Sequence, residues 1–364
     1  MSGAGWWERG LAQVRHEWRE LTTVNASDRR WPMPFCAALA IGLPLLVGAG
    51  FGRIEYGLVS SLGGLVFLYL PETPLSHRMV VLLAAAFAMC ACFALGLLSQ
   101  FLPGLEVPVL TVIAVLMSML CRFYLVGPPG SLFFIMAAAI GAYSPLAVDE
   151  VPHQVGLLTM GCLLACLIAF GYSLHALRRQ PPQPVRPLAP ASFDFVIFDS
   201  IVIGTCVGIS LALAQLLQLE RPYWVPVSCL AVIQGVSLRA VWSKQLQRIV
   251  GTGLGLLLAG ALLRLPLDPW SVALLMMLLA FVIETLVVRH YGLAVVFITP
   301  LTILLADAPH LGLTPPDGLL QARLADTVLG CLVGLAGAVA LHSPRFRDVL
   351  GRRLRRLAPA RFRL

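Results

Sequence analysis

Long apolar stretches without charged residues recur along this chain between Pro34 and Leu341. Several approach the ~20 residues that an α-helix needs to cross the hydrocarbon core of a bilayer. Hydrophobic residues make up 59% of the 364 residues and charged residues only 12%, whereas a typical soluble domain is roughly 25% charged. The sequence therefore predicts an all-helical polytopic membrane protein, with no stretch long enough for a separate soluble domain. We expect no enzyme activity outside the membrane, and none inside it, because the spans contain no cluster of acid, His or Ser nucleophile motifs at one depth.

Glycine, proline and charged residues divide the apolar stretches into about twelve expected transmembrane helices, arranged as two sets of six. The expected spans are residues 34–51, 57–70, 79–101, 107–121, 130–146, 155–177, 195–218, 223–237, 247–263, 270–288, 292–306 and 322–341. We predict short, interrupted second and fifth helices in each set, because these segments are brief or contain proline and glycine.

The remaining segments suggest a domain plan. Residues 1–33 form a predicted amphipathic interfacial segment, with Trp7, Leu11, Val14, Trp18 and Leu21 on one helical face. The first repeat is expected over 34–177, a basic proline-rich linker over 178–194, the second repeat over 195–341, and an arginine-rich tail over 342–364. The first segment lacks the apolar core and cleavage site of a signal peptide, so we expect the first span to be retained.

Charge predicts the orientation of the chain in the membrane. If the N-terminus is cytoplasmic, only Arg53, Arg221, Arg264 and Arg323 lie outside, and the other cationic side chains lie inside. This distribution follows the positive-inside rule. Both termini and the linker are therefore predicted to be cytoplasmic.

Two motifs with the same spacing occur in the second half. Arg248-x-x-Gly-Thr252-x-x-Gly255 matches Arg323-x-x-Asp-Thr327-x-x-Gly330, and the two spans that carry them are expected to run in opposite directions. This pattern favours a nested inverted repeat of three plus three helices, an arrangement in which short broken helices surround a site near the middle of the membrane.

These residues resemble a known family. Tyr223-Trp224-Val-Pro226, Gln234, the motif from Arg248 to Gly255 and the motif from Arg323 to Gly330 are similar to those of the fusaric acid resistance (FUSC-like) aromatic acid exporters. The resemblance covers about 196–341 and is weak over 34–177. It implies a bacterial inner-membrane efflux protein for small aromatic or other organic acids, with plant aluminium-activated malate channels as distant relatives in fold. It also implies a possible homodimer or a periplasmic adaptor as partner.

Several residues are candidates for a substrate site. Arg78 and Arg248 begin the third span of each half, where they could anchor the inner face or pair with an organic anion. The aromatic residues Tyr56, Tyr223 and Trp224 could form an interfacial belt or stack on an aromatic substrate. Gln234 could hydrogen-bond to a substrate or to a neighbouring helix.

Other candidates concern proton coupling and helix packing. Glu284 and Asp326 are the expected proton-carrying acids, although Glu284 could instead reach the cytoplasmic side and Asp326 could pair with Arg323. Small residues permit close contact between membrane helices. The expected packing or hinge residues are Gly251, Thr252, Gly255, Arg323, Thr327 and Gly330.

The sequence gives no indication of a cofactor or a metal. The nine cysteines lie almost all in apolar runs without the clustering that zinc needs, so we interpret them as reduced core residues. The net charge of +8 lies mostly at the chain ends and in the linker, which favours the lipid bilayer over nucleic acid as partner. No nucleotide-binding P-loop is present. Three functions remain open: a proton-coupled exporter, a passive organic-anion channel, and a scaffold in envelope biogenesis that does not transport.

Overall fold

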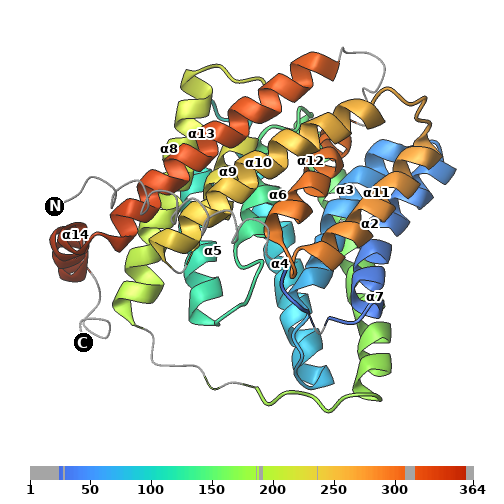
Figure 1. The fold of residues 1–364 in the computed structure, drawn as a ribbon, viewed down its shortest axis with the longest axis horizontal. Coiled ribbons are helices and arrows are strands. Elements are labelled where there is room, and N and C mark those ends of the chain that lie inside the picture. Colours follow the sequence, from blue (N-terminus) through green and yellow to red (C-terminus); the bar gives the residue numbers. More distant parts are fainter. Residues whose placement is uncertain are drawn as a thin grey trace, which may run out of the picture.

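The computed structural model describes residues 24–27, 29–185, 187, 192–235, 237–307 and 316–357. These residues form thirteen α-helices and no strand, which confirms the all-helical prediction (Figure 1). Most of the predicted interfacial segment, residues 1–23, lies outside the described part of the chain, as do parts of the linker and residues 358–364.

The first half of the chain contains six α-helices at the positions of the first six expected spans. They are α2 (Pro32–Gly50), α3 (Ile54–Gly64), α4 (Leu75–Ser99), α5 (Glu106–Phe123), α6 (Leu132–Ala142) and α7 (Val151–Leu177). The 3-10 helix η1 (Leu65–Tyr69) continues α3, and η2 (Val148–Glu150) precedes α7.

The second half begins with the π-helix η3 (Phe193–Phe198), which leads directly into the next α-helix. The helices are α8 (Asp199–Leu216), α9 (Trp224–Ile233), α10 (Leu238–Leu262), α11 (Pro269–Leu286), α12 (Tyr291–Asp307), α13 (Pro316–His342) and α14 (Pro344–Leu357). The last of these occupies part of the predicted arginine-rich tail.

Seven helical segments of the described chain are long and apolar enough to cross a membrane. They are Pro32–Gly50, Leu75–Ser99, Glu106–Phe123, Val148–Leu177, Phe193–Leu216, Pro269–Leu286 and Gly318–His342. Four shorter apolar helices lie where short spans were expected: Ile54–Tyr69, Leu132–Ala142, Trp224–Ile233 and Tyr291–Leu305. The chain is thus a multi-pass membrane protein by length and composition, and seven candidate spans replace the predicted twelve as the number that these criteria support.

Local sequence explains how the helices of the second half begin. Ser237 caps α10 by accepting a hydrogen bond from the backbone N–H of Ala240, at 3.2 Å. Asp268 caps α11 in the same way through Ser271, at 3.2 Å, and Pro269 at the first helical position fits the helix because its missing N–H would have had no partner. The hydroxyl of Ser271 and nearby backbone N–H groups lower the pKa of the Asp268 carboxyl.

The helices pack in matching pairs in the two halves. In the first half α3 packs on α2 and α7, and α4 packs on α6 and α7; in the second half α9 packs on α8 and α13, and α10 packs on α12 and α13. The halves meet where α2 packs on α11 and where α5 packs on α8. α10 and α13 run side by side in opposite directions (Figure 1).

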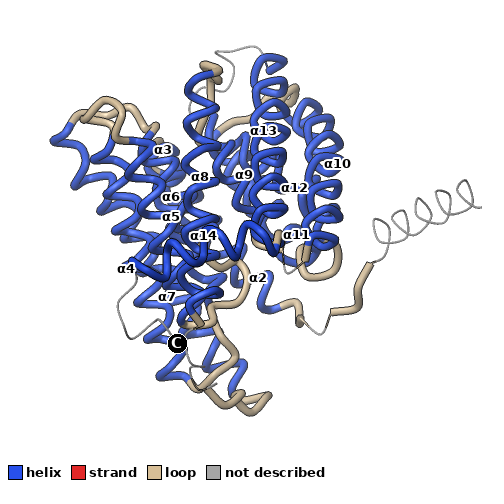
Figure 2. The backbone as a smooth tube through the Cα atoms, turned by 90° about the vertical axis from the view of Figure 1, so that its left-hand side faces the viewer, coloured by secondary structure: helices blue, strands red, loops and turns tan. Residues whose placement is uncertain are grey.

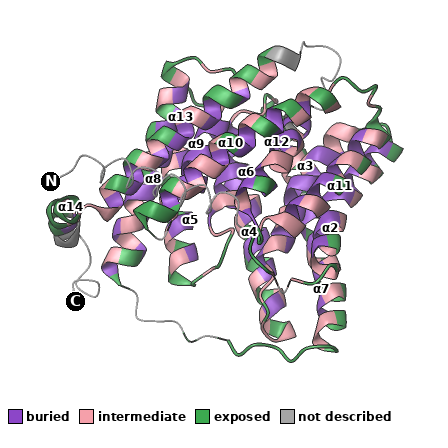
Figure 3. Ribbon diagram, in the orientation of Figure 1, coloured by how far each residue is buried: buried purple, intermediate pink, exposed green. Residues whose placement is uncertain are grey.

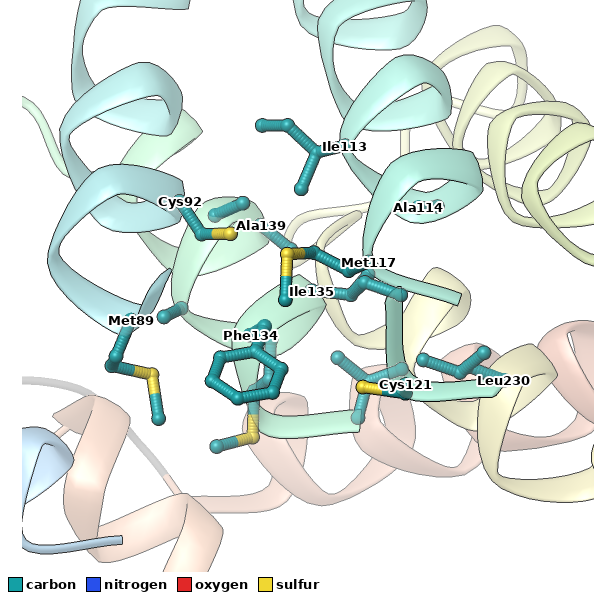
Figure 4. Packing of buried hydrophobic residues seen from close by; sticks show 14 of the residues in the cluster. Met89, Cys92, Ile113, Ala114, Met117, Cys121, Phe134, Ile135, Ala139 and Leu230 are labelled. Carbon is teal, nitrogen blue, oxygen red and sulfur yellow. The ribbon is translucent and has the colours of Figure 1, made fainter. Parts of the chain in front are cut away.

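The largest buried cluster joins α4, α5 and α6 and extends to α9 of the second half. Met89, Met117, Phe134 and Leu230 show this contact, with helices from both halves around them (Figure 4). All nine cysteines are free, and five of them are buried. Figure 3 shows the buried residues along the inner faces of the helices and the exposed ones on the ends and outer faces.

Candidate functional site

The short helices α9 and α12 are the elements around which the candidate site is built. Every residue of α9 is buried. Glycines bring the long helices close to them: a Cβ at Gly330 of α13 would lie 2.4 Å from the carbonyl oxygen of Val225, and one at Gly255 of α10 would lie 2.7 Å from that of Val296. Gly251 approaches α12 and Gly334 approaches α9 in the same way. No other residue type fits at such separations, so the backbones are in direct contact.

Arg248 is buried between α9, α10 and α12, with 7% of its surface exposed. Its Nη1 donates a hydrogen bond to the hydroxyl of Tyr291, at 3.0 Å, and its Nη2 donates one to Ser228 Oγ, at 3.1 Å. The anchoring interpretation of Arg248 predicted a side chain that reaches the membrane surface. Instead, the guanidinium points inward, because α9 and α12 both offer it hydroxyl acceptors.

Arg323 of α13 is buried to a similar degree, with 6% of its surface exposed. Its Nη2 donates a hydrogen bond to Thr302 Oγ1, at 3.1 Å, and its guanidinium carbon lies 3.9 Å from the centre of the Trp224 ring. A guanidinium stacked on an indole is attracted by the electrons of the ring face, an interaction of about 2 kcal/mol when it is desolvated. Arg323 is therefore held by α12 on one side and by α9 on the other.

The two arginines have equivalent surroundings. Arg248 uses a hydroxyl on α9 and an aromatic residue at the start of α12, whereas Arg323 uses a hydroxyl on α12 and an aromatic residue at the start of α9. Trp224 and Ser228 are one helical turn apart on α9, so the two guanidinium groups contact neighbouring turns of α9.

Polar atoms without hydrogen-bond partners surround this pair. Among the described residues they include Nε of Arg248, Nε and Nη1 of Arg323, and both carboxylate oxygens of Asp326, whose side chain is fully buried. Buried polar groups in proteins nearly always have partners, and a buried group without one costs about 1–3 kcal/mol or more when charged. The interior of the site thus contains N–H donors and a carboxylate that have no hydrogen-bond partner.

Both threonines of the motifs are buried. Thr327 Oγ1 donates a hydrogen bond to the carbonyl oxygen of Arg323, at 2.9 Å, and Thr252 is buried on α10 with 3% of its surface exposed. Thr327 therefore bonds within its own helix and does not contact the guanidinium groups directly.

The region that contains the two buried arginines matches a known family. Residues 207–337 match the family described as fusaric acid resistance protein-like. This part of the chain is similar to that family, and two curated relatives do not extend the assignment to the whole chain. The match covers nearly all of α8 to α13, including both buried arginines, and it confirms the resemblance inferred from the motifs.

Two curated relatives are themselves uncharacterized. The uncharacterized membrane protein YvaC of Bacillus subtilis (strain 168) is 21% identical, over 87% of this chain and 74% of its own length. The uncharacterized protein YhfK of Escherichia coli (strain K12) is 28% identical, over 57% of this chain and 30% of its own length. The chain therefore spans about three quarters of the first relative and less than a third of the second. No solved structure matches the chain.

Aromatic residues extend the cluster around the two arginines toward the first half. The ring centre of Tyr223 lies 5.2 Å from that of Trp224 and 6.0 Å from that of Tyr143 at the end of α6. The Tyr143 hydroxyl accepts a hydrogen bond from Gln215 of α8, at 2.7 Å. Tyr223 and Trp224 are 8% and 3% exposed, so they are part of a buried cluster rather than of a belt on the lipid-facing surface.

Gln234 lies at the opposite end of α9 and faces the first half. Its Nε2 donates a hydrogen bond to Ser131 Oγ, at 3.0 Å, and Ser131 in turn lies 3.2 Å from Ser118 Oγ. The hydroxyl of Tyr69 donates to the carbonyl oxygen of Gly130 in the same loop, at 2.8 Å. Gln234 therefore bonds to a neighbouring element, one of its two predicted roles, and does not contact the arginines.

The structure does not bring the first-half candidates to the two arginines. Arg78 is buried, and it donates hydrogen bonds to the Thr73 carbonyl oxygen, at 2.6 Å, and to Ser173 Oγ of α7, at 3.4 Å. Tyr56 packs edge to face on His153, with 4.9 Å between the ring centres. Both side chains therefore contact elements of the first half.

Glu284 of α11 pairs with the segment before α2. Arg29 Nη1 lies 3.1 Å from its carboxylate and also bonds to its backbone carbonyl oxygen, at 3.2 Å. This ion pair crosses the contact between the halves and was not predicted, because Arg29 is distant in sequence. Among the described residues, no group of three or more His, Cys, Asp and Glu side chains is placed to hold a metal ion.

The sequence pattern does not point to Ser228, Tyr291 and Thr302, the hydroxyl residues that hold the two guanidinium groups. The available signal was their position, because each is a polar residue in an apolar run on a short helix. A polar side chain at such a position needs a partner inside the protein, and the sequence does not show which one.

Proposed function

We propose that this chain is an inner-membrane efflux transporter for small organic acids, including aromatic ones. The observation that carries the proposal is the pair of buried guanidinium groups of Arg248 and Arg323. They contact neighbouring turns of α9 and retain N–H donors without hydrogen-bond partners. Two permanent positive charges inside a membrane protein attract an anion, and guanidinium binds a carboxylate through two parallel hydrogen bonds. The site therefore suits a small carboxylate better than a cation or a neutral solute.

The aromatic residues beside Arg323 support aromatic acids as substrates. Trp224 already stacks on Arg323, and Tyr223 and Tyr143 continue the cluster on its outer side. A carboxylate bound at the guanidinium groups would place its ring beside these faces, where aromatic pairs contribute about 0.5–1.5 kcal/mol beyond the buried area. An aliphatic acid would gain only the charge interaction.

Asp326 is our preferred proton carrier. It lies one turn from Arg323, it is fully buried, and neither of its oxygens has a hydrogen-bond partner. Glu284 is less suitable, because its carboxylate is engaged by Arg29. Export against a gradient needs an energy source, and this chain has no nucleotide-binding motif, which supports coupling to the proton gradient.

We further propose that all twelve helices from α2 to α13 span the membrane as two repeats of six, including α10, which is not among the apolar helices given above. The matching contacts described above support this arrangement: the pair α3 and α7 corresponds to α9 and α13, and the contact of α2 with α11 corresponds to that of α5 with α8. A nested inverted repeat within α8–α13 is supported by the equivalent surroundings of Arg248 and Arg323. Such repeats place a substrate site near the middle of the bilayer.

The decisive experiment measures uptake of radiolabelled aromatic acids, such as benzoate and its hydroxy derivatives, into inverted membrane vesicles. The parent is compared with Arg248→Gln and with the control Arg264→Gln, which removes an exposed arginine just after the end of the same helix. We expect uptake by the parent and the control, loss in Arg248→Gln, and loss with a protonophore. Uptake that survives the protonophore but is lost in Arg248→Gln would indicate a passive anion channel. Normal uptake in Arg248→Gln would contradict the proposal that Arg248 binds substrate. If the parent takes up none of the acids, the non-transporting scaffold is the function that remains.

A further inference from the structure

Helix α14 is the one strongly basic helix of the described chain. It begins at Pro344, after the single residue Ser343 that follows α13, and six of its fourteen residues are arginine. Figure 2 shows α14 turned away from the direction of α13 and lying across the bundle. Because α13 is a candidate span, α14 begins where a membrane helix ends, and its direction places it along the membrane surface.

Side-chain contacts hold α14 against the start of α8. Phe346 packs edge to face on Phe198, with 6.3 Å between the ring centres. Arg347 lies over the same Phe198 ring and within 3.3 Å of the Asp199 carboxylate. The position of α14 is therefore fixed by the protein itself and does not depend on a partner.

The charge of α14 is not neutralised by these contacts. Asp199 is shared between Arg347 and Arg122 of α5, whose Nη1 lies 3.0 Å from the carboxylate. Arg345, Arg352 and Arg353 are exposed, and so is the apolar Val349, with 52% of its surface accessible. A helix with arginines and apolar residues exposed at the end of a membrane span is typical of segments that lie in the lipid head-group region.

We propose that α14 binds the anionic phospholipid head groups of the leaflet at which α13 ends. Arginine pairs with phosphate through two hydrogen bonds, and each arginine near an anionic membrane surface strengthens association roughly fivefold. The exposed apolar side chain would enter the boundary between head groups and acyl chains. This proposal rests on the membrane location of the chain and is independent of whether it transports organic acids.

The test is hydrogen–deuterium exchange of the full chain in nanodiscs of phosphatidylcholine alone or with phosphatidylglycerol. The variant Arg345→Gln/Arg352→Gln/Arg353→Gln removes three exposed arginines of α14. The control Arg178→Gln/Arg179→Gln/Arg264→Gln removes three exposed arginines elsewhere. Equal thermal midpoints in phosphatidylcholine verify that both variants fold.

We expect phosphatidylglycerol to slow exchange in the peptides covering 344–357 in the parent and the control. In the α14 variant the factor by which phosphatidylglycerol slows this exchange should fall by on the order of 100-fold, which is the product of the contributions of three arginines. Native mass spectrometry should show fewer retained phosphatidylglycerol molecules on the same variant. Equal exchange of the parent peptides in both lipids would overturn the proposal, and so would an equal loss in the control variant.

Discussion

The guanidinium carbon of Arg323 lies 3.9 Å from the centre of the Trp224 ring. Trp224 is one helical turn from Ser228, which accepts a hydrogen bond from Arg248. Helix α9 thus holds two buried arginines that come from two antiparallel helices. This relationship makes the second half of the chain a candidate anion site, and it determines which substitutions are informative.

Replacement of Trp224 should affect binding more than turnover. In Trp224→Ala, Arg323 loses the aromatic face that fixes its position and the substrate loses a stacking surface, so we expect KM for an aromatic acid to rise roughly tenfold. Trp224→Phe keeps a ring and should lie closer to the parent. Uptake kinetics in vesicles measure both variants, and a similar change of KM for an aliphatic acid would show that the ring acts only through Arg323.

Substitution of Asp326 should separate transport from its energy source. Asp326→Asn keeps the shape of the side chain but cannot carry a proton, so we expect downhill movement of substrate to persist while accumulation driven by a pH gradient is lost. Counterflow and pH-driven uptake in proteoliposomes distinguish these activities. Glu284→Gln combined with Arg29→Gln is the matched control, because it removes an acid that the structure shows in an ion pair. Intact pH-driven accumulation in Asp326→Asn would exclude this residue as the proton carrier.

Loss of Arg29 alone should destabilise the protein more than loss of both Arg29 and Glu284. Arg29→Gln leaves the Glu284 carboxylate, with 10% of its side chain exposed, without its cation, while Arg29 itself is 29% exposed. Loss of one partner of a fully buried pair costs about 3–5 kcal/mol, so we expect a smaller loss for this partly buried pair. We expect a clear fall in the thermal midpoint in Arg29→Gln and partial recovery in the double variant Arg29→Gln/Glu284→Gln. Additive losses in the double variant would show that the two side chains are not coupled.

Gly161 of α7 should tolerate no side chain. A Cβ there would lie 1.8 Å from the carbonyl oxygen of Ser60 on α3, whereas a Cβ at Gly156 of the same helix meets nothing within 4 Å. We expect Gly161→Ala to destabilise the protein by about 1–3 kcal/mol through overpacking, and Gly156→Ala to be neutral or slightly stabilising. Thermal unfolding in detergent compares the two. Equal midpoints would mean that α3 and α7 separate at little cost.

The Asp268 cap should make a contribution to stability that depends on pH. Hydrogen bonds from Ser271 and from backbone N–H groups lower the pKa of this carboxyl in the folded state. Its contribution is therefore complete above the unfolded pKa of about 4 and is lost as the pH falls through the lower folded pKa. Asp268→Ala should unfold at a lower temperature than the parent at pH 7, with a difference that shrinks below about pH 4. Asp268→Asn, which caps without titrating, should show no such pH dependence.

The sequence by itself determined the helical class and the positions of the helices. Apolar runs near the length of a bilayer can satisfy their backbone hydrogen bonds only within helices, so most of the helices from α2 to α13 lie where the spans were expected. The exception is α10, which begins at Leu238 and not at the expected residue 247, so Arg248 lies within the helix and not at its start. The motifs around Arg248 and Arg323 also indicated the fusaric acid resistance-like region, because charged residues and glycines are informative against an apolar background.

Only the tertiary structure decided which residues form the site. The sequence suggested Arg78 as the counterpart of Arg248, yet Arg78 bonds to Thr73 and Ser173, and Arg323 occupies the equivalent surroundings instead. It also gave no sign that Arg29 would engage Glu284, or that Arg122 and Arg347 would share Asp199. Spacing along a helix fixes which face a side chain occupies, but the packing of helices far apart in sequence decides what that face meets.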